Sequence, residues 1–165
     1  MVEITEAEIM NTWKNNNVVV SIDTLSYNHA KYISQCLDGL LKQRTNFAFE
    51  ILVCDDASTD DTAKLIHEYE EKYPNIVVPL YQIENKYSKG IKMSATYQFP
   101  CAKGKYIAIC EGDDYWIDEN KLQMQVAFLE TNPEYGICYT KVKQYIEKDK
   151  KIIRGDFGKK CCNST

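Results

Sequence analysis

Short apolar runs alternate along this chain with segments whose apolar residues recur three or four positions apart. Runs rich in β-branched residues predict buried strands, and the helical period predicts amphipathic helices. The predicted strands span 18–22, 49–54, 76–82 and 106–110, and the predicted helices span about 29–41, 61–73, 93–99 and 119–130. This alternation predicts an α/β fold, with a mostly parallel central sheet and helices on both of its faces.

Residues beside these segments indicate where the helices begin and how the sheet is ordered. Asn28 is a plausible N-cap for the first long helix, and Ser58, Thr59 or Asp60 can cap the second. Pro79 cannot donate a hydrogen bond to a neighbouring strand, so it predicts an irregular or edge position for its strand.

Polar clusters follow three of the predicted strands. Residues 26–28 follow the first strand, Asp55 and Asp56 follow the second, and Asp113 and Asp114 follow the fourth. Because ligands of parallel α/β sheets bind at the carboxyl ends of the strands, we expect the three clusters to meet at one edge. That convergence is stronger evidence for a binding site than any one of the clusters.

The pair Asp113 and Asp114 is the best candidate for a metal site. Two adjacent carboxylates repel each other unless a cation lies between them. Mg²⁺ commonly takes one or two carboxylates and fills its other positions with water and substrate phosphates. The competing interpretation is a helix cap or a solvated turn. His29 and His67 have no second ligand at metal-binding spacing, so we interpret both as surface helix residues.

Composition and charge narrow the function classes further. The chain has 165 residues, 44% of them hydrophobic, and a net charge of −4, which gives no support for a nucleic-acid partner. No apolar run approaches the length of a transmembrane helix, and the polar N-terminus does not resemble a secretory signal. Seven cysteines without a Cys-x-x-Cys pair predict reduced thiols in a cytoplasmic protein. Attachment at the inner face of the membrane is the alternative, and Cys161 and Cys162 have no interpretation.

Several other chemistries lack their sequence motifs. The chain has no Gly-x-Gly-x-x-Gly, no phosphate-binding loop ending in Gly-Lys-Ser/Thr, no nucleophile elbow and no kinase motif. A sugar-nucleotide pyrophosphorylase would need a glycine-rich basic loop after the first strand, which is absent. A phosphoacceptor receiver domain would place its acids after different strands.

The three clusters together resemble the nucleotide-sugar-binding part of a family 2 glycosyltransferase of the GT-A fold. Residues 18–28 resemble the first strand of that family, which commonly ends Pro-Thr-Tyr-Asn. Residues 49–62 resemble the second strand and its Asp-Asp-Gly-Ser-Thr-Asp turn, with Ala57 in place of the glycine. Residues 102–116 resemble the strand that leads to the Asp-x-Asp-type metal motif. The resemblance implies a Rossmann-like, three-layer αβα domain.

The resemblance also implies roles for individual residues. Tyr27 would pack near a uracil-type base and Asp56 would accept its hydrogen bonds, while Leu25 stands at a nucleotide-binding position where the family often has Pro or Thr. Asp113 would contact the ribose or diphosphate, and Asp114 would bind Mn²⁺ or Mg²⁺ between the two phosphates. The loop after the third predicted strand contains three lysines that are weaker candidates for contacts with the phosphates: Lys86, Lys89 and Lys92.

We therefore expect an inverting, metal-dependent glycosyltransferase that uses a nucleotide-diphosphate sugar, with a UDP-sugar as the expected donor. The acceptor, a glycan or a lipid-linked or other molecule, is unknown; polysaccharide biosynthesis is the expected role. The expected organisation is a peripheral segment at 1–16, a binding domain at 17–147 and a tail at 148–165. Within the domain, strands are also expected at 136–140 and 141–146, with a turn at 148–151. Nothing after residue 146 resembles the acceptor-binding half of the family, so no general base can be named. The alternative is an incomplete module that binds the nucleotide-sugar without turnover.

Overall fold

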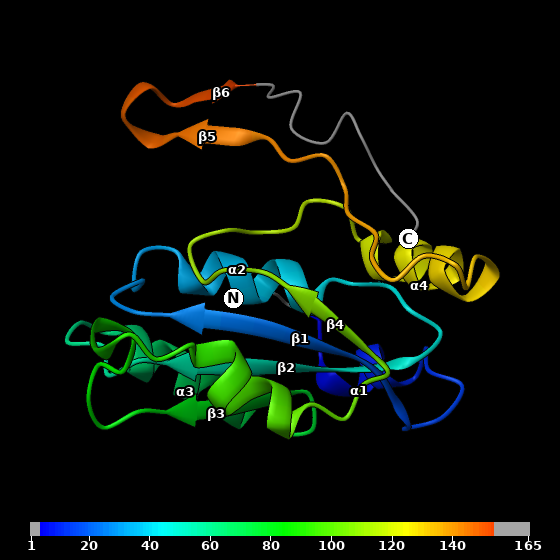
Figure 1. The fold of residues 1–165 in the computed structure, drawn as a ribbon, viewed down its shortest axis with the longest axis horizontal. Coiled ribbons are helices and arrows are strands. Elements are labelled where there is room, and N and C mark those ends of the chain that lie inside the picture. Colours follow the sequence, from blue (N-terminus) through cyan, green and yellow to red (C-terminus); the bar gives the residue numbers. More distant parts are fainter. Residues whose placement is uncertain (1–3, 154–165) are drawn as a thin grey trace. The chain divides into compact units, whose positions relative to one another are not determined.

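The computed structural model describes residues 4–153, which group into two compact units that divide after Gln123. The first unit contains a four-stranded sheet in the order β3-β2-β1-β4, and every neighbouring pair is parallel. Its strands are β1 (Val18–Ser26), β2 (Ala48–Asp55), β3 (Val77–Tyr81) and β4 (Tyr106–Ile109). Figure 1 shows them side by side with their carboxyl ends at the same edge. The predicted parallel α/β sheet is therefore confirmed.

Helices cover both faces of this sheet (Figure 1). Helices α2 (Ile33–Leu41) and α3 (Thr62–Lys72) lie on one face, where Tyr69 of α3 donates a hydrogen bond to the Asp38 carboxylate of α2. The other face carries the π-helix η2 (Ser94–Gln98) and the 3-10 turn η3 (Phe99–Cys101). Gln98 is buried and donates to the backbone carbonyls of Thr24 and Leu52, so η2 is fixed to β1 and β2.

The apolar patterns of the sequence identify the core of this unit. The central strands β1 and β2 are almost wholly buried, as their continuous apolar runs predict. The predicted inner faces of α2 and α3 are also confirmed, since the following side chains are no more than 1% exposed: Ile33, Cys36, Leu37, Leu40 and Leu41 of α2, and Ile66, Tyr69 and Tyr73 in or beside α3.

The two outer strands differ from each other in how well the sequence predicts them. Pro79 lies in β3 at one edge of the sheet, as expected. The prediction that the run ending at Cys110 is a buried strand is wrong for β4, which forms the opposite edge. Ile107 and Ile109 of β4 are 41% and 62% exposed. An apolar run indicates that a strand is able to be buried, but it does not indicate whether another element covers that strand.

Smaller elements complete the first unit. Helix α1 (Glu6–Met10) begins at a capping box, in which Thr5 and Glu8 satisfy each other's backbone N–H groups. The turn η1 (Tyr87–Lys89) lies in the long loop after β3. Helix α4 (Lys121–Thr131) begins in the first unit and continues into the second. Within the described residues, no helix has the length and apolar character that crossing a bilayer requires.

The second unit contains the remainder of α4 and an antiparallel hairpin of β5 (Gln144–Ile146) and β6 (Lys151–Ile153), joined by the 3-10 turn η4 (Glu147–Asp149). The turn predicted near residues 148–151 is confirmed, with Lys150 at a positive φ of 47°. The strand predicted at 136–140 is wrong, because that segment has no strand pairing and exposes Ile137 and Tyr139. Residues 154–165, including Cys161 and Cys162, lie outside the described residues.

Candidate functional site

The loop after β1 is bound to the loop after β2 through Asn28. Its side-chain oxygen accepts a hydrogen bond from the Thr59 N–H at 2.8 Å, and its own N–H donates to Ser58 Oγ at 2.9 Å. Asn28 has a positive φ of 55°, a conformation that Asn tolerates better than most residues. The predicted capping role is wrong, because α2 begins later and has no side-chain cap. Asn28 instead links the loop after β1 to the loop after β2.

The turn after β2 is built around its own acidic residues. Asp55, the last residue of β2, accepts hydrogen bonds from the backbone and the hydroxyl of Ser58. Ala57 has a positive φ of 60°. The predicted cap at Ser58, Thr59 or Asp60 is wrong by one residue, because the N-cap of α3 is Asp61, whose side chain makes no capping bond. Asp60, the residue before it, accepts the N–H of Thr62, the first residue of α3.

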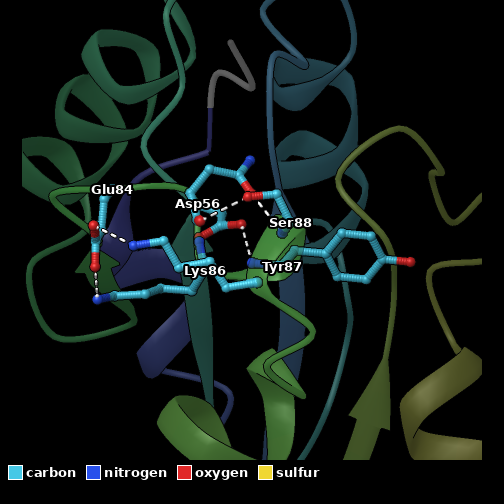
Figure 2. A network of polar contacts seen from close by, with 7 residues as sticks. Asp56, Glu84, Lys86, Tyr87 and Ser88 are labelled. Carbon is cyan, nitrogen blue, oxygen red and sulfur yellow. Dashed lines mark hydrogen bonds and ion pairs between the residues drawn. The ribbon is translucent and has the colours of Figure 1, made fainter.

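Asp56 is buried, with 1% of its surface exposed, and its N–H donates to the carbonyl of Ser26 at the end of β1 at 2.9 Å. Its two carboxylate oxygens accept the backbone N–H groups of Lys86 and Tyr87 at 2.7 and 2.9 Å, as Figure 2 shows. A carboxylate has about four acceptor positions, so lone pairs remain for a further donor. Asp56 thus fixes the loop after β3 against the carboxyl edge of the sheet.

The lysines of this loop are held by an acid of the same loop. Lys86 forms an ion pair with Glu84, which Figure 2 shows, and Lys89 forms a second one with the same carboxylate. The hydrogen bonds from Lys86 and then Lys89 lower the pKa of Glu84 to about 2, and the bond to Glu84 raises the pKa of Lys86. Both ammonium groups are therefore engaged with Glu84, while Lys92 lies further along the loop.

The acidic loop after β4 is packed closely against the end of β1. The Gly112 N–H donates to the Leu25 carbonyl at 2.9 Å. A Cβ at Gly112 would lie 2.9 Å from that carbonyl oxygen, 2.9 Å from His29 Nδ1 and 3.1 Å from Ser26 Cβ. Only glycine fits such a close approach without movement of its neighbours. Gly112 therefore sets the position of Asp113 and Asp114, both of which are exposed.

His29 is the clearest correction to the interpretation of single residues. The sequence places it on the surface of a helix, but it precedes α2 and its Nδ1 is buried against Gly112. Its ring also contacts Tyr32 edge-on, with 6.5 Å between the ring centroids. His67, in contrast, lies on the exposed side of α3 and pairs with Glu70, as a surface helix residue does.

Negative charge accumulates at this end of the sheet. Although Asp114 is exposed, partial loss of solvent around its carboxylate, followed by repulsion from Asp113, raises its pKa. Partial loss of solvent also raises the pKa of the exposed Glu111, and repulsion from Asp23, Asp113 and Asp114 adds to this effect. Asp23 of β1 is 2% exposed, and its burial raises its pKa despite contacts with η2. All three shifts are upward because loss of solvent is the largest cause of each, and repulsion between carboxylates adds to it for Glu111 and Asp114.

Asp23 is a site residue that the sequence interpretation missed. A signal was present, since it is the one acid within the apolar run 18–25. Tyr87 was also missed, because the loop after β3 has no periodic pattern that would indicate which of its residues reach the sheet edge.

The aromatic residues that follow the acids have different surroundings. A Cβ at Gly39 of α2 would lie 2.8 Å from the Trp116 carbonyl oxygen, so this segment runs closely over α2. The Lys121 ammonium lies 4.2 Å from the centre of the Trp116 ring. Tyr115 is 40% exposed. Packing is thus the role that the contacts show for Trp116.

The cysteines near the acidic loop behave as buried thiols. Cys36 of α2 and Cys110 are 0% and 4% exposed, and their sulfur atoms lie 4.0 Å apart. The Cys110 thiol and burial raise the pKa of Cys36, so the unreactive thiol form is favoured. Burial raises the pKa of Cys54 to about 12. All three thiols are free and buried in the structure, as small apolar side chains are.

A divalent cation fits the chemistry of this edge if the ligand supplies part of its coordination. In the described part of the chain, no three His, Cys, Asp or Glu side chains are grouped to hold a metal ion. A site with one or two carboxylates and substrate phosphates does not require such a group. Repulsion from Asp113 is the second cause of the raised pKa of Asp114, and a cation beside the pair would reduce this repulsion.

The end of β1 connects the predicted binding residues. The Ser26 carbonyl accepts the N–H of Asp56 on one side, and the Leu25 carbonyl accepts the N–H of Gly112 on the other. Tyr27 follows directly and is 41% exposed. The structure therefore places a buried acceptor, an exposed aromatic ring and the acidic pair around the last residues of one strand.

Comparison with known proteins agrees with this arrangement. Residues 21–158 match the family described as Glycosyl transferase family 2. A relative in Escherichia coli, the UDP-Glc:alpha-D-GlcNAc-diphosphoundecaprenol beta-1,3-glucosyltransferase WfaP, is 34% identical over 84% of this chain and 51% of its own length. An uncharacterized protein of Mycobacterium tuberculosis is 41% identical over 78% of this chain and 36% of its own. The chain thus spans between about a third and a half of these relatives.

Solved structures give the same result for the fold. Staphylococcus aureus TarS 1–349 in complex with UDP superposes with a TM-score of 0.60 and 28% identity, over 70% of this chain and 33% of that one. The mannosyltransferase PcManGT of Pyrobaculum calidifontis superposes with a TM-score of 0.58 and 24% identity, over 67% of this chain and 32% of that one. The predicted GT-A architecture is therefore confirmed.

Proposed function

The chain belongs to glycosyl transferase family 2, and from this we propose that its sheet edge binds a nucleotide-diphosphate sugar whose sugar is transferred to an acceptor. The observation that carries the proposal is the connection of both Asp56 and the acidic loop to the last two residues of β1. A nucleotide is polar and charged at one end and aromatic at the other. This edge offers a buried acceptor beside Tyr27 and an acidic pair beyond Gly112.

The base would bind on the side of β1 that faces β2. Tyr27 would pack against the base, and Asp56 would accept a hydrogen bond from a ring N–H through the lone pairs that the loop leaves open. Leu25 would contribute through its backbone, since its carbonyl fixes the acidic loop. A UDP-sugar is the proposed donor, because WfaP is named for UDP-Glc and TarS binds UDP.

The diphosphate would bind on the side of β1 that faces β4. We propose that Asp113 contacts the ribose or diphosphate and that Asp114 binds Mn²⁺ or Mg²⁺ together with the two phosphates. When bound, the cation would neutralise the negative charge of the leaving group. Lys86 and Lys89 are unsuited to the same task while Glu84 engages them.

The proposed transfer inverts the anomeric carbon. The acceptor hydroxyl oxygen attacks that carbon in line, the bond to the diphosphate oxygen breaks, and the nucleoside diphosphate leaves with the bonding electrons. The hydroxyl proton passes to a general base. Relatives extend well beyond the length that this chain spans, and we assign the base and the acceptor site to that further part. Cytoplasmic polysaccharide biosynthesis and a binding domain at 17–147 belong to the same proposal, which names no acceptor.

Calorimetry with UDP in the presence of Mn²⁺, and again after addition of EDTA, tests the site. We expect binding with metal and much weaker binding without it. Absence of metal-dependent binding would reject the proposed site. If UDP binds, release of UDP from a UDP-sugar with candidate acceptors separates the transferase from its alternative, a module that binds the nucleotide-sugar without turnover.

A further inference from the structure

Tyr87 is an exposed aromatic residue beside the most buried acid of the edge. Its N–H donates to the Asp56 carboxylate at 2.9 Å, while its side chain is 70% exposed. Figure 2 shows this side chain extending away from the ion pairs of Glu84 and Lys86. The backbone of Tyr87 is therefore fixed to the binding edge, and its ring is free to meet a ligand.

A second tyrosine is connected to the same acid from the opposite direction. The Asp56 N–H donates to the carbonyl of Ser26, and Tyr27 is the next residue. Asp56 is thus joined by two hydrogen bonds to the turn that carries Tyr87 and by a third to the residue that precedes Tyr27. Each of the two segments that bind Asp56 therefore carries an exposed tyrosine, Tyr87 in one and Tyr27 in the other. A planar base that reaches the Asp56 carboxylate approaches both segments.

We propose that Tyr87 is a second aromatic contact for the nucleobase. This contact would set how much the base contributes to the binding affinity of the nucleotide-sugar donor. This inference rests on the proposed function of the same site. Aromatic side chains bind base rings through their faces, and the contact accepts different bases because every base has such a face. In this arrangement Asp56 has two tasks: it holds the turn that carries Tyr87, and it accepts from the edge of the base.

The test measures the affinity for UDP in the presence of Mn²⁺, with GDP as a second probe, for the wild type and for three variants. Tyr87→Ala should weaken binding about tenfold or more, the scale expected for loss of one base–aromatic contact. Tyr87→Phe and Tyr87→Trp keep a ring and should keep the wild-type affinity within about threefold on the same basis. Tyr145→Ala, which removes a tyrosine that is 49% exposed in β5, is the matched control and should have no effect.

Thermal melts of all variants separate binding from folding, and Tyr87→Ala should melt as the wild type does because its ring is exposed. Equal affinity of Tyr87→Ala and wild type would overturn the inference and leave the proposed function intact. So would a loss of affinity in Tyr87→Phe as large as in Tyr87→Ala, because the hydroxyl and not the ring face would then be the contact. Failure of the wild type to bind either nucleotide would instead reject the proposed function.

Discussion

Gly112→Ala tests the conclusion that close packing against β1 sets the position of the acidic pair. The new Cβ would lie 2.9 Å from the Leu25 carbonyl oxygen and 2.9 Å from His29 Nδ1. Both distances are shorter than normal contacts of carbon with oxygen or nitrogen. The carbonyl belongs to a central strand and the imidazole nitrogen is buried, so neither neighbour can move away freely.

The expected cost follows from this crowding. Adding a methyl group to a well-packed site costs about 1–3 kcal/mol. Replacing glycine by alanine also restricts the unfolded chain, which returns about 0.4–1 kcal/mol. The net loss in the free energy of unfolding should therefore be about 1–2 kcal/mol, which corresponds to a melting temperature lower by about 2–8 °C for a chain of this size.

The assay combines a thermal melt with a titration of UDP in the presence of Mn²⁺. Relief of the crowding displaces the loop that carries the acids, so we expect the affinity for UDP to fall about tenfold or more, since small displacements of site residues are costly. Gly136→Ala is the control, because nothing lies within 4 Å of its added Cβ. An unchanged melt and an unchanged affinity in Gly112→Ala would show that the contact does not fix the loop.

Three further substitutions test the charges and the backbone of the site. Asp114→Asn should abolish Mn²⁺-dependent binding of UDP in calorimetry. Its melting temperature in buffer without metal should be unchanged or higher, because repulsion from Asp113 is relieved. A large loss of stability without metal would contradict this. Burial raises the pKa of Asp23, so the folded state holds this proton to higher pH and loses stability as the pH rises above the ordinary range of an Asp. Asp23→Asn should therefore be more stabilising in urea unfolding at pH 8 than at about pH 3, below the ordinary pKa of an Asp, and a difference independent of pH would refute the assignment. Ala57→Gly should raise the free energy of unfolding by about 0.5–1 kcal/mol, because φ is positive at this residue and glycine adopts that conformation without strain. The control Ala63→Gly, in α3, should lower the free energy of unfolding by about 1 kcal/mol. Equal effects of the two substitutions would exclude strain at Ala57.

The sequence predicted the sheet and its buried helices because their signals are local. A strand that is apolar on both sides, such as β2, is buried only where helices cover both faces of its sheet. The spacing of Ile33, Leu37 and Leu40 places all three on one face of α2. Parallel order then follows from the alternation of strands and helices, which also brings the ends of β1, β2 and β4 to one edge.

Local signals did not report which elements lack a neighbour. The runs at 106–110 and 136–140 have similar strand composition, yet the first forms an edge strand and the second forms no strand pairing in the described structure. The difference depends on the presence of a partner surface, which periodicity does not contain.

The sequence by itself determined that acids and a tyrosine follow three strands of one parallel sheet, since residue order and period fix which strand end each one follows. Only the tertiary structure decided what those residues contact. Asp56 binds the backbone of a loop 30 residues later, and His29 packs on Gly112. Such contacts join residues far apart in the chain through backbone groups that all residues share. The pattern of side chains along the sequence therefore does not indicate them.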